Sequence, residues 1–320
     1  MVHSALLILV GFLLLYAGGE ALVRGAGGLA LRLGMSSFIV GMTVVAFATS
    51  SPELAVSVQA AIAGQDDVAI GNVVGSNICN IALILGLCAL IRPQEVQMRI
   101  LRMDVPWLIF ASALLVAFLD DGRISRAAGT VLVIGLVVFI YWNIQMARRD
   151  SEEDRVREEF EQVVEDKHRK PWVDWALMGG GLGLLVAGGS AFVRGGVGLA
   201  EAMGVSAALI SLTVVALGTS LPELATSLVA TFHGDDDIAV GNIIGSNFFN
   251  ILAILGITAV LHPLSRGAIT LLDLYVMLGF TVFLLPLIFV RRRIGRPEGL
   301  VLLVGYFTYM GWLVRQGAAS

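Results

Sequence analysis

The chain has 320 residues, of which 57% are hydrophobic and 14% are charged, and its formal net charge is −4. A soluble domain usually carries about 25% charged residues, so this composition excludes a water-soluble globular protein, and it offers no basic surface for nucleic acid. The two cysteines provide neither a disulfide framework nor a paired-cysteine metal motif, and we predict an all-α polytopic membrane protein.

Apolar runs of about 20 residues, the length that crosses a bilayer, recur along the whole chain. They predict ten transmembrane helices, at residues 3–22, 37–62, 68–91, 104–119, 126–146, 174–193, 207–232, 238–261, 270–290 and 299–315. A highly charged segment, residues 148–172, separates the first five from the last five. This segment is typical of a solvated linker, with a small regulatory element as the alternative. It divides the chain into two five-helix units, residues 1–147 and 173–320.

The second unit repeats the first at an offset of 170 residues. Residues 14–86 align with 184–256 without a gap, and about 40 of the 73 positions are identical. Because each unit has an odd number of helices, the second must enter the membrane in the opposite orientation. The sequence therefore predicts two inverted five-helix repeats, related by a pseudo-two-fold axis in the membrane plane that brings equivalent residues face to face near the midplane.

Lysine and arginine predict the orientation, because cytoplasmic loops are enriched in them. Sixteen of the 21 basic residues fall in the odd-numbered loops, which include the central linker, and five fall in the even-numbered loops and the C-terminal tail. We therefore expect a multi-pass protein of the plasma (inner) membrane, with a cytoplasmic linker and both termini outside.

The second helix of each unit carries a carboxylate within an apolar run. Glu53 follows two hydroxyl residues, Thr49 and Ser50, and the second unit repeats this arrangement with Thr219, Ser220 and Glu223. An ionisable residue at membrane depth is costly, so it is by default a functional-site hypothesis. The two acids are therefore the strongest site candidates in the chain.

A proline precedes each of these acids. Pro52 removes a backbone donor and is expected to push Ser51 out of helical geometry, which frees the carbonyl oxygens of the preceding turn. Carbonyl, hydroxyl and carboxylate oxygens together are ligands that suit Ca²⁺ and Na⁺. We therefore expect a hard-cation site at this helix break.

The third helix of each unit carries a polar stripe, because polar residues recur every four positions on one face. The stripes consist of Asn72, Ser76 and Asn80 in the first unit and Asn242, Ser246 and Asn250 in the second. Such side chains also serve as interhelical hydrogen-bond partners, and we favour that interpretation for Asn72 and Asn242. Two carboxylates carry a charge of −2, which matches one Ca²⁺ bound between the two units.

At these residues the chain resembles the cation/calcium antiporter superfamily, specifically the prokaryotic sodium/calcium exchangers. The resemblance rests on residues 49–53 with 75–80 and on their counterparts, 219–223 with 245–250. It implies alternating access, in which the first and sixth helices slide as a gate past the other eight. It also implies backbone carbonyl ligands at Ala46 and Ala216, and side-chain cation ligands at Glu53, Glu223, Thr49, Ser50, Ser76, Asn80, Thr219, Ser220 and Ser246.

One position departs from the family pattern. Many sodium/calcium and potassium-dependent exchangers carry Asp where this chain has Asn250, which we keep as a candidate ligand because of its symmetry with Asn80. The resemblance implies an antiporter that exchanges Ca²⁺ for Na⁺, with H⁺/Ca²⁺ exchange and K⁺-dependent exchange as alternatives. A cation channel is the alternative from another class.

No enzymatic activity is expected. The sequence contains no HExxH motif, and its four histidines fall at loops or helix ends. The expected partners are membrane lipid and the transported Ca²⁺ and Na⁺, without a further cofactor or an obligatory protein partner.

Overall fold

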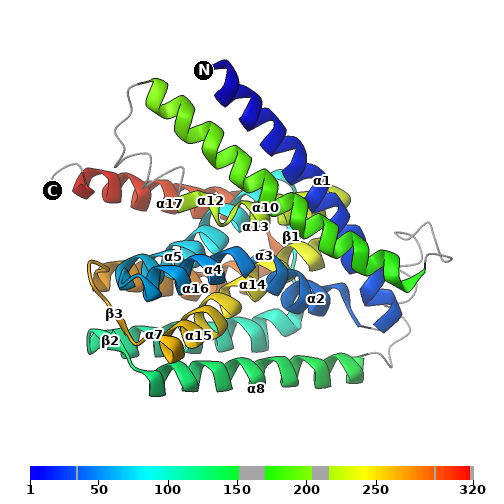
Figure 1. Ribbon diagram of the computed structural model, residues 1–320. Helices are drawn as coiled ribbons and strands as arrows, with labels where there is room; N and C mark the ends of the chain where they lie inside the picture. The colour runs from blue at the N-terminus through cyan, green and yellow to red at the C-terminus, as the bar shows by residue number, and fades with distance from the viewer. Residues whose placement is uncertain (34, 151–169, 204–215, 292, 318–320) are drawn as a thin grey trace.

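The computed structural model describes residues 1–33, 35–150, 170–203, 216–291 and 293–317, and these are almost entirely helical (Figure 1). A helix satisfies its backbone polar groups within one segment, which is what hydrocarbon requires of a spanning chain. Among the described residues, eight helices are long and apolar enough to cross a membrane, and the bent pair Ser37–Thr49 and Ser51–Ile62 is a ninth candidate span.

The elements have the following bounds. The first half comprises α1 (Val2–Leu33), α2 (Ser37–Val40), η1 (Gly41–Val45), α3 (Ala46–Thr49), α4 (Ser51–Ile62), α5 (Asp66–Ile78), η2 (Cys79–Ile84), α6 (Leu85–Ile91), β1 (Gln94–Glu95), η3 (Ile100–Asp104), α7 (Val105–Asp120), β2 (Arg123–Ile124) and α8 (Arg126–Asp150). The second half comprises α10 (Pro171–Ala202), α12 (Ala216–Gly218), α13 (Leu221–His233), α14 (Asp236–Phe248), η5 (Phe249–Leu255), α15 (Gly256–Leu261), β3 (Leu264–Ser265), α16 (Leu271–Arg291), β4 (Arg293–Ile294) and α17 (Arg296–Gly317).

Nine of the ten expected spans coincide with eight of these helices or with the bent pair. The seventh, expected at 207–232, begins within residues 204–215, which lie outside the described residues, and α13 covers its second part. Most of the expected linker, residues 151–169, also lies outside them.

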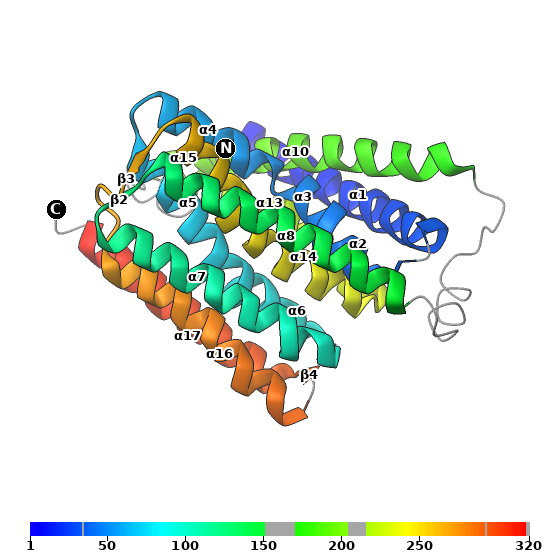
Figure 2. The ribbon, with the colours of Figure 1, turned by 90° about the horizontal axis from the view of Figure 1, so that it is seen from below.

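The first and sixth spans are longer than the sequence predicted, because α1 and α10 each have 32 residues. At 1.5 Å per residue each measures about 48 Å, well beyond the roughly 30 Å of a hydrocarbon core. They lie side by side along one edge of the molecule (Figures 1 and 2). Glycines allow this contact, since a Cβ atom on Gly18 would lie 2.8 Å from the backbone oxygen of Gly181.

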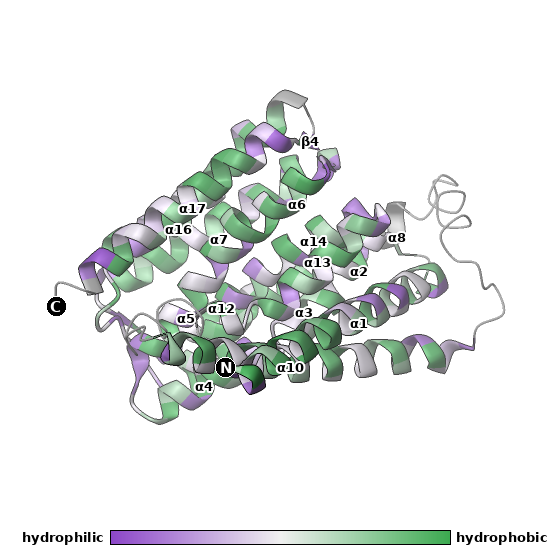
Figure 3. Cartoon of the chain, turned by 90° about the horizontal axis from the view of Figure 1, so that it is seen from above, coloured by the Kyte–Doolittle hydropathy of each residue, from purple (hydrophilic) through white to green (hydrophobic). Residues whose placement is uncertain are grey.

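Two helical segments form the centre of the molecule, Asp66–Ile91 and Asp236–Leu261. Their most apolar windows are 78% and 89% buried, compared with 17–33% for α1, α8, α10, α16 and α17. The outer helices instead present hydrophobic residues along their length, as Figure 3 shows. Each central segment contains a π-helix, η2 or η5, and π-helical turns frequently mark functional sites.

The second span breaks at a serine, and the same break recurs in the second half. Ser50 has φ −84° and ψ 4°, and Ser220 has φ −86° and ψ 4°. We expected Ser51 to leave helical geometry, but α4 begins at Ser51 and the break lies one residue earlier. The reason is that the first helical turn tolerates a proline, whose missing N–H is not needed there. The two arms, Ser37–Thr49 and Ser51–Ile62, meet at 43°.

Two short antiparallel ladders connect the halves, which the prediction of an all-α chain did not include. In one, β1 pairs with β4, and Gln94 lies opposite Ile294. In the other, β2 pairs with β3, and Ile124 lies opposite Leu264. Each ladder joins a loop of one half to a loop of the other, and two-residue strands carry too little sequence pattern to be predicted.

Candidate cation-binding site

The two carboxylates lie where the broken helices resume. Glu53 is in the first turn of α4 and Glu223 in the first turn of α13, and each is only 1% exposed. The partial positive charge of a helix N-terminus favours an anion at this position. The proline-induced break therefore both places and stabilises each acid inside the apolar bundle.

Each carboxylate accepts a hydrogen bond from the serine of the opposite half. The Ser50 hydroxyl donates to Glu223 Oε1 at 2.9 Å, and the Ser220 hydroxyl approaches Glu53 Oε1 at 3.5 Å. These serines are the residues at the two breaks. The two breaks therefore lie against each other, and a single site is built from both halves of the chain.

The threonines next to these serines reach across in the same way. The Thr49 hydroxyl lies 3.1 Å from Asn242 Oδ1, and the Thr219 hydroxyl lies 3.2 Å from Asn72 Oδ1. Each asparagine accepts from the opposite half and uses its amide group within its own half. The structure therefore places Asn72 and Asn242 between a threonine and a carboxylate-bearing helix.

The amide groups of these asparagines hold the helices that carry the acids. Asn72 Nδ2 donates to the backbone oxygen of Glu53 at 3.2 Å and to Ser57 Oγ at 3.0 Å. Asn242 Nδ2 donates to the backbone oxygen of Glu223 at 3.5 Å and to Ser227 Oγ at 3.0 Å. We did not predict a role for Ser57 or Ser227 from their positions in the sequence. Their identity at the 170-residue offset, one turn past each acid, was the signal that could have found them.

The polar residues of the two central segments complete the surroundings. The Ser220 hydroxyl lies 3.2 Å from Ser76 Oγ, and Asn250 Nδ2 donates to Asn77 Oδ1 at 3.1 Å. Asn80 lies in η2, where neither its nitrogen nor its oxygen has a hydrogen-bond partner, and the buried hydroxyl of Ser246 has none either. These residues are at most 4% exposed, so they belong to the same dry interior as the acids.

The two expected carbonyl ligands differ in what the structure shows of them. The Ala46 oxygen accepts the Ser50 amide at 3.0 Å and lies 3.3 Å from the Thr49 hydroxyl. Because a carbonyl has two lone pairs, a cation at this oxygen would have to replace the Thr49 contact. Ala216 is the first residue of α12, directly after the undescribed residues 204–215.

Several buried oxygen atoms at this site lack any hydrogen-bond donor. They are one oxygen of each carboxylate, Glu53 Oε2 and Glu223 Oε2, and the amide oxygens of Asn80 and Asn250. Buried polar atoms are costly without a partner, and oxygen atoms of this kind are the ligands that hard cations take. Within the described ranges no three His, Cys, Asp or Glu side chains gather as a metal cluster, so hydroxyl and amide oxygens would have to complete a coordination shell.

Ion pairs lie at the ends of the central segments, away from the carboxylates. Asp236 begins α14 with Oδ1 3.9 Å from Arg92 Nε, and Asp66 begins α5 with Oδ1 3.5 Å from His262 Nδ1. Beside the first pair, burial raises the pKa of Asp235, although that carboxylate accepts the Ile238 amide. We call these two ends the Arg92 rim and the His262 rim.

Glu20 on α1 pairs with Arg24, its neighbour one turn along the helix. The two side chains are 2.6 Å apart. Glu20 also lies 3.4 Å from His233, which links α1 to the end of α13. Glu20 is therefore accounted for outside the cluster around the two acids.

Known proteins match this chain over nearly its whole length. The model of the family described as sodium/calcium exchanger protein matches it twice, at residues 3–145 and 173–315. A putative antiporter, CaxA of Alkalimonas amylolytica, is 38% identical over 97% of this chain and 98% of its own length. The sodium/calcium exchanger MaX1 of Methanosarcina acetivorans is 31% identical over 95% of this chain and 97% of its own. A solved structure of the sodium-calcium exchanger NCX_Mj, from Methanococcus jannaschii, superposes with a TM-score of 0.83 at 29% identity, covering 97% of this chain and 98% of that one.

Proposed function

The chain belongs to the sodium/calcium exchanger protein family, and on this basis we propose that it is a secondary active antiporter that exchanges Ca²⁺ for Na⁺. One observation carries the proposal. Two buried carboxylates from different halves are joined by reciprocal serine hydrogen bonds, and each keeps one oxygen without a donor. A Ca²⁺ ion bound between Glu53 and Glu223 would satisfy both oxygens and balance both charges.

We propose the remaining ligands from the residues around the acids. Na⁺ would take the hydroxyl, amide and carbonyl positions and displace Ca²⁺, and the full set is Thr49, Ser50, Ser76, Asn80, Thr219, Ser220, Ser246 and Asn250 with the carbonyls of Ala46 and Ala216. An empty site would leave a dianion in a low-dielectric interior, which is unfavourable to move past apolar surfaces. Loading with either ion removes that barrier, so exchange is obligatory and leak is suppressed.

The proposed membrane arrangement is ten helices in two inverted five-helix repeats, residues 1–147 and 173–320, joined by a cytoplasmic linker at 148–172, with both termini outside. The family model matches two segments whose start points and end points are each 170 residues apart, which supports the repeat. The glycine contact between α1 and α10 suits a pair of helices that moves as one gate.

Ca²⁺ uptake into liposomes loaded with Na⁺ tests the proposal. The wild-type protein should take up Ca²⁺ only when an outward-directed Na⁺ gradient drives the exchange. Glu53→Gln or Glu223→Gln should lower uptake to the rate of protein-free liposomes. Glu95→Gln is the matched control, because Glu95 is exposed and lies in β1, outside the helices. It should retain wild-type uptake.

The same assay separates the alternatives. The voltage is clamped by an ionophore in these measurements. Ca²⁺ uptake that a K⁺ or H⁺ gradient drives without Na⁺ would identify that ion, rather than Na⁺, as the counter-ion. Net Ca²⁺ movement without any counter-ion on the opposite side would identify a channel. Uptake that persists in both glutamine variants would refute a site between the two acids.

A further inference from the structure

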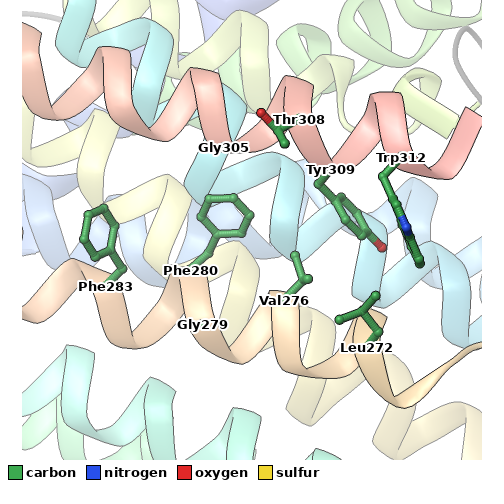
Figure 4. A pocket seen from close by; sticks show the side chains of 9 residues that line it. All are labelled: Leu272, Val276, Gly279, Phe280, Phe283, Gly305, Thr308, Tyr309 and Trp312. Carbon is green, nitrogen blue, oxygen red and sulfur yellow. The ribbon is translucent and has the colours of Figure 1, made fainter.

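A concave apolar groove lies between α16 and α17, on the opposite edge of the molecule from α1 and α10 (Figures 2 and 4). Its volume is about 610 Å³. Sites of this size and apolar lining commonly hold small molecules. None of the residues that line it contributes to the cluster around Glu53 and Glu223, so the groove requires a separate explanation.

The two hydroxyl groups of the groove are not available to a ligand, because both are satisfied within the protein. The Thr308 hydroxyl donates to the Val304 carbonyl at 2.7 Å, and the Tyr309 hydroxyl donates to Asp273 Oδ1 at 2.7 Å. What remains for a ligand is aliphatic and aromatic surface, including Leu272 and Phe283, which are 46% and 37% exposed. Both helices are candidate membrane spans, so this surface faces lipid tails.

The groove has the length of one leaflet. Leu272 lies at the start of α16 and Phe283 lies eleven residues further on, a rise of about 17 Å along the helix. Half of a hydrocarbon core is about 15 Å. An extended acyl chain that enters beside Leu272 would therefore reach the middle of the bilayer beside Phe283.

Glycine opens the wall of the groove. A Cβ atom on Gly279 would meet nothing within 4 Å, so this residue leaves free space where a side chain would otherwise fill the groove. Gly305 on α17 allows the Phe280 ring to approach the helix closely, since a Cβ atom on Gly305 would lie 3.0 Å from that ring. The two glycines therefore keep the groove open between α16 and α17.

The end of the groove beside Leu272 suits a lipid headgroup. Trp312 stacks on Tyr309 with ring centroids 6.1 Å apart, and indole N–H groups favour the membrane interface. Arg315 follows one turn later on α17, is exposed, and has no acidic partner within the described residues. Asp273 is 7% exposed, and its two oxygens are taken by Tyr309 and Thr270, so it is withdrawn from the headgroup.

We propose that this groove is a binding site for one acyl chain of an anionic phospholipid, whose phosphate contacts Trp312 and Arg315 at the interface. The lipid is held by the α16–α17 pair, independently of the cation site. A bound tail fills the space over Gly279, and the headgroup charge is matched by the guanidinium.

Native mass spectrometry of the full chain tests the site, with phosphatidylglycerol and phosphatidylcholine of identical tails as probes. The wild-type protein should retain one phosphatidylglycerol. Gly279→Leu should lower its retention at least about tenfold by filling the groove. Gly311→Leu is the matched control, because a Cβ atom there also meets nothing within 4 Å but Gly311 does not line the groove, and retention should be unchanged.

Arg315→Gln keeps the test valid if Gly279→Leu fails to fold. It should reduce the preference for phosphatidylglycerol over phosphatidylcholine by about fivefold while a lipid stays bound. Equal loss of lipid in both leucine variants, no retained lipid in the wild type, or an unchanged preference in Arg315→Gln would each overturn the proposal. So would a dimer that Gly279→Leu dissociates without changing lipid retention, since the groove would then be an interface between two copies.

Discussion

The contacts at the centre of the molecule recur in both halves at the 170-residue offset, whereas those at its two ends differ between the halves. At the centre, the contact of Ser50 with Glu223 has its counterpart in the contact of Ser220 with Glu53. At the ends, Asp236 faces Arg92, but its counterpart Asp66 faces His262. A site assembled by both halves needs the same chemistry from each. In the proposed topology the two ends lie at opposite faces of the membrane, so equivalent residues there need not have the same chemistry.

The α1–α10 pair shows the same contrast along its length. At one end Asp174, which is 1% exposed, pairs with Arg32 at 2.5 Å and lies against Gly28. At the other end the equivalent of Asp174 is Ser4, which lies against Gly198 without an acid. The two ends share a small-residue contact, but among the described residues only the Asp174 end holds a charged pair.

The largest expected effect comes from removing that difference with Asp174→Ser. Breaking a buried ion pair costs about 3–5 kcal/mol, and because a third of the Arg32 side chain is exposed we expect about 2 kcal/mol here. The measurement is thermal unfolding in detergent. Ser4→Ala at the opposite end should change stability by less than about 0.5–1 kcal/mol. Equal losses at both ends would mean that the ion pair contributes nothing beyond helix packing.

At the centre, the matching contacts of the two halves predict that equivalent substitutions have equal effects on Ca²⁺ affinity. Asn72→Ala and Asn242→Ala each remove an acceptor for a threonine and the donor that holds the helix bearing an acid. Leaving buried groups unsatisfied costs about 1–3 kcal/mol, so each change should weaken apparent Ca²⁺ affinity by about five- to 150-fold. The measurement is the Ca²⁺ dependence of Na⁺-driven uptake. A more than tenfold difference between the two variants would show that the halves contribute unequally.

Much of this architecture could be predicted because hydrocarbon imposes simple rules. Length and hydropathy located nine of the ten expected spans, and the duplicated motif identified Glu53 and Glu223 as residues that the fold brings together. The repeat also predicted that polar residues of the third and eighth spans would surround them. The two acids could be recognised without a structure, because a charge inside an apolar span has few roles besides function.

Other features depend on tertiary contacts that no periodicity encodes. We favoured an interhelical role for Asn72, and its hydrogen bonds are interhelical, but the sequence could not identify Thr219 of the other half as its partner. The first span was expected to end at residue 22, whereas α1 continues to Leu33, with Gly25 and Gly28 packed closely against α10. The two-residue ladders also arise only when loops of opposite halves meet.

The smallest expected effect concerns the two rims. An imidazole is charged only when protonated, which happens between about pH 5 and 8, whereas a guanidinium is always charged. The Arg92 rim therefore holds a permanent cation beside Asp236, and His262→Arg would place a permanent cation beside Asp66 as well. If opening the His262 rim contributes to turnover, Na⁺-driven Ca²⁺ uptake should be about two- to threefold slower in His262→Arg than in the wild type, since exposed pairs are worth about 0.2–1 kcal/mol.

The exchange of residues between the rims completes this test. Arg92→His should have the opposite effect at the other end, and the double variant, Arg92→His with His262→Arg, should return Ca²⁺ uptake to about the wild-type rate. Equal uptake rates for the wild type and His262→Arg would show that the chemical difference between the rims has no consequence for transport. The asymmetry would then be confined to the end of the α1–α10 pair that carries Asp174.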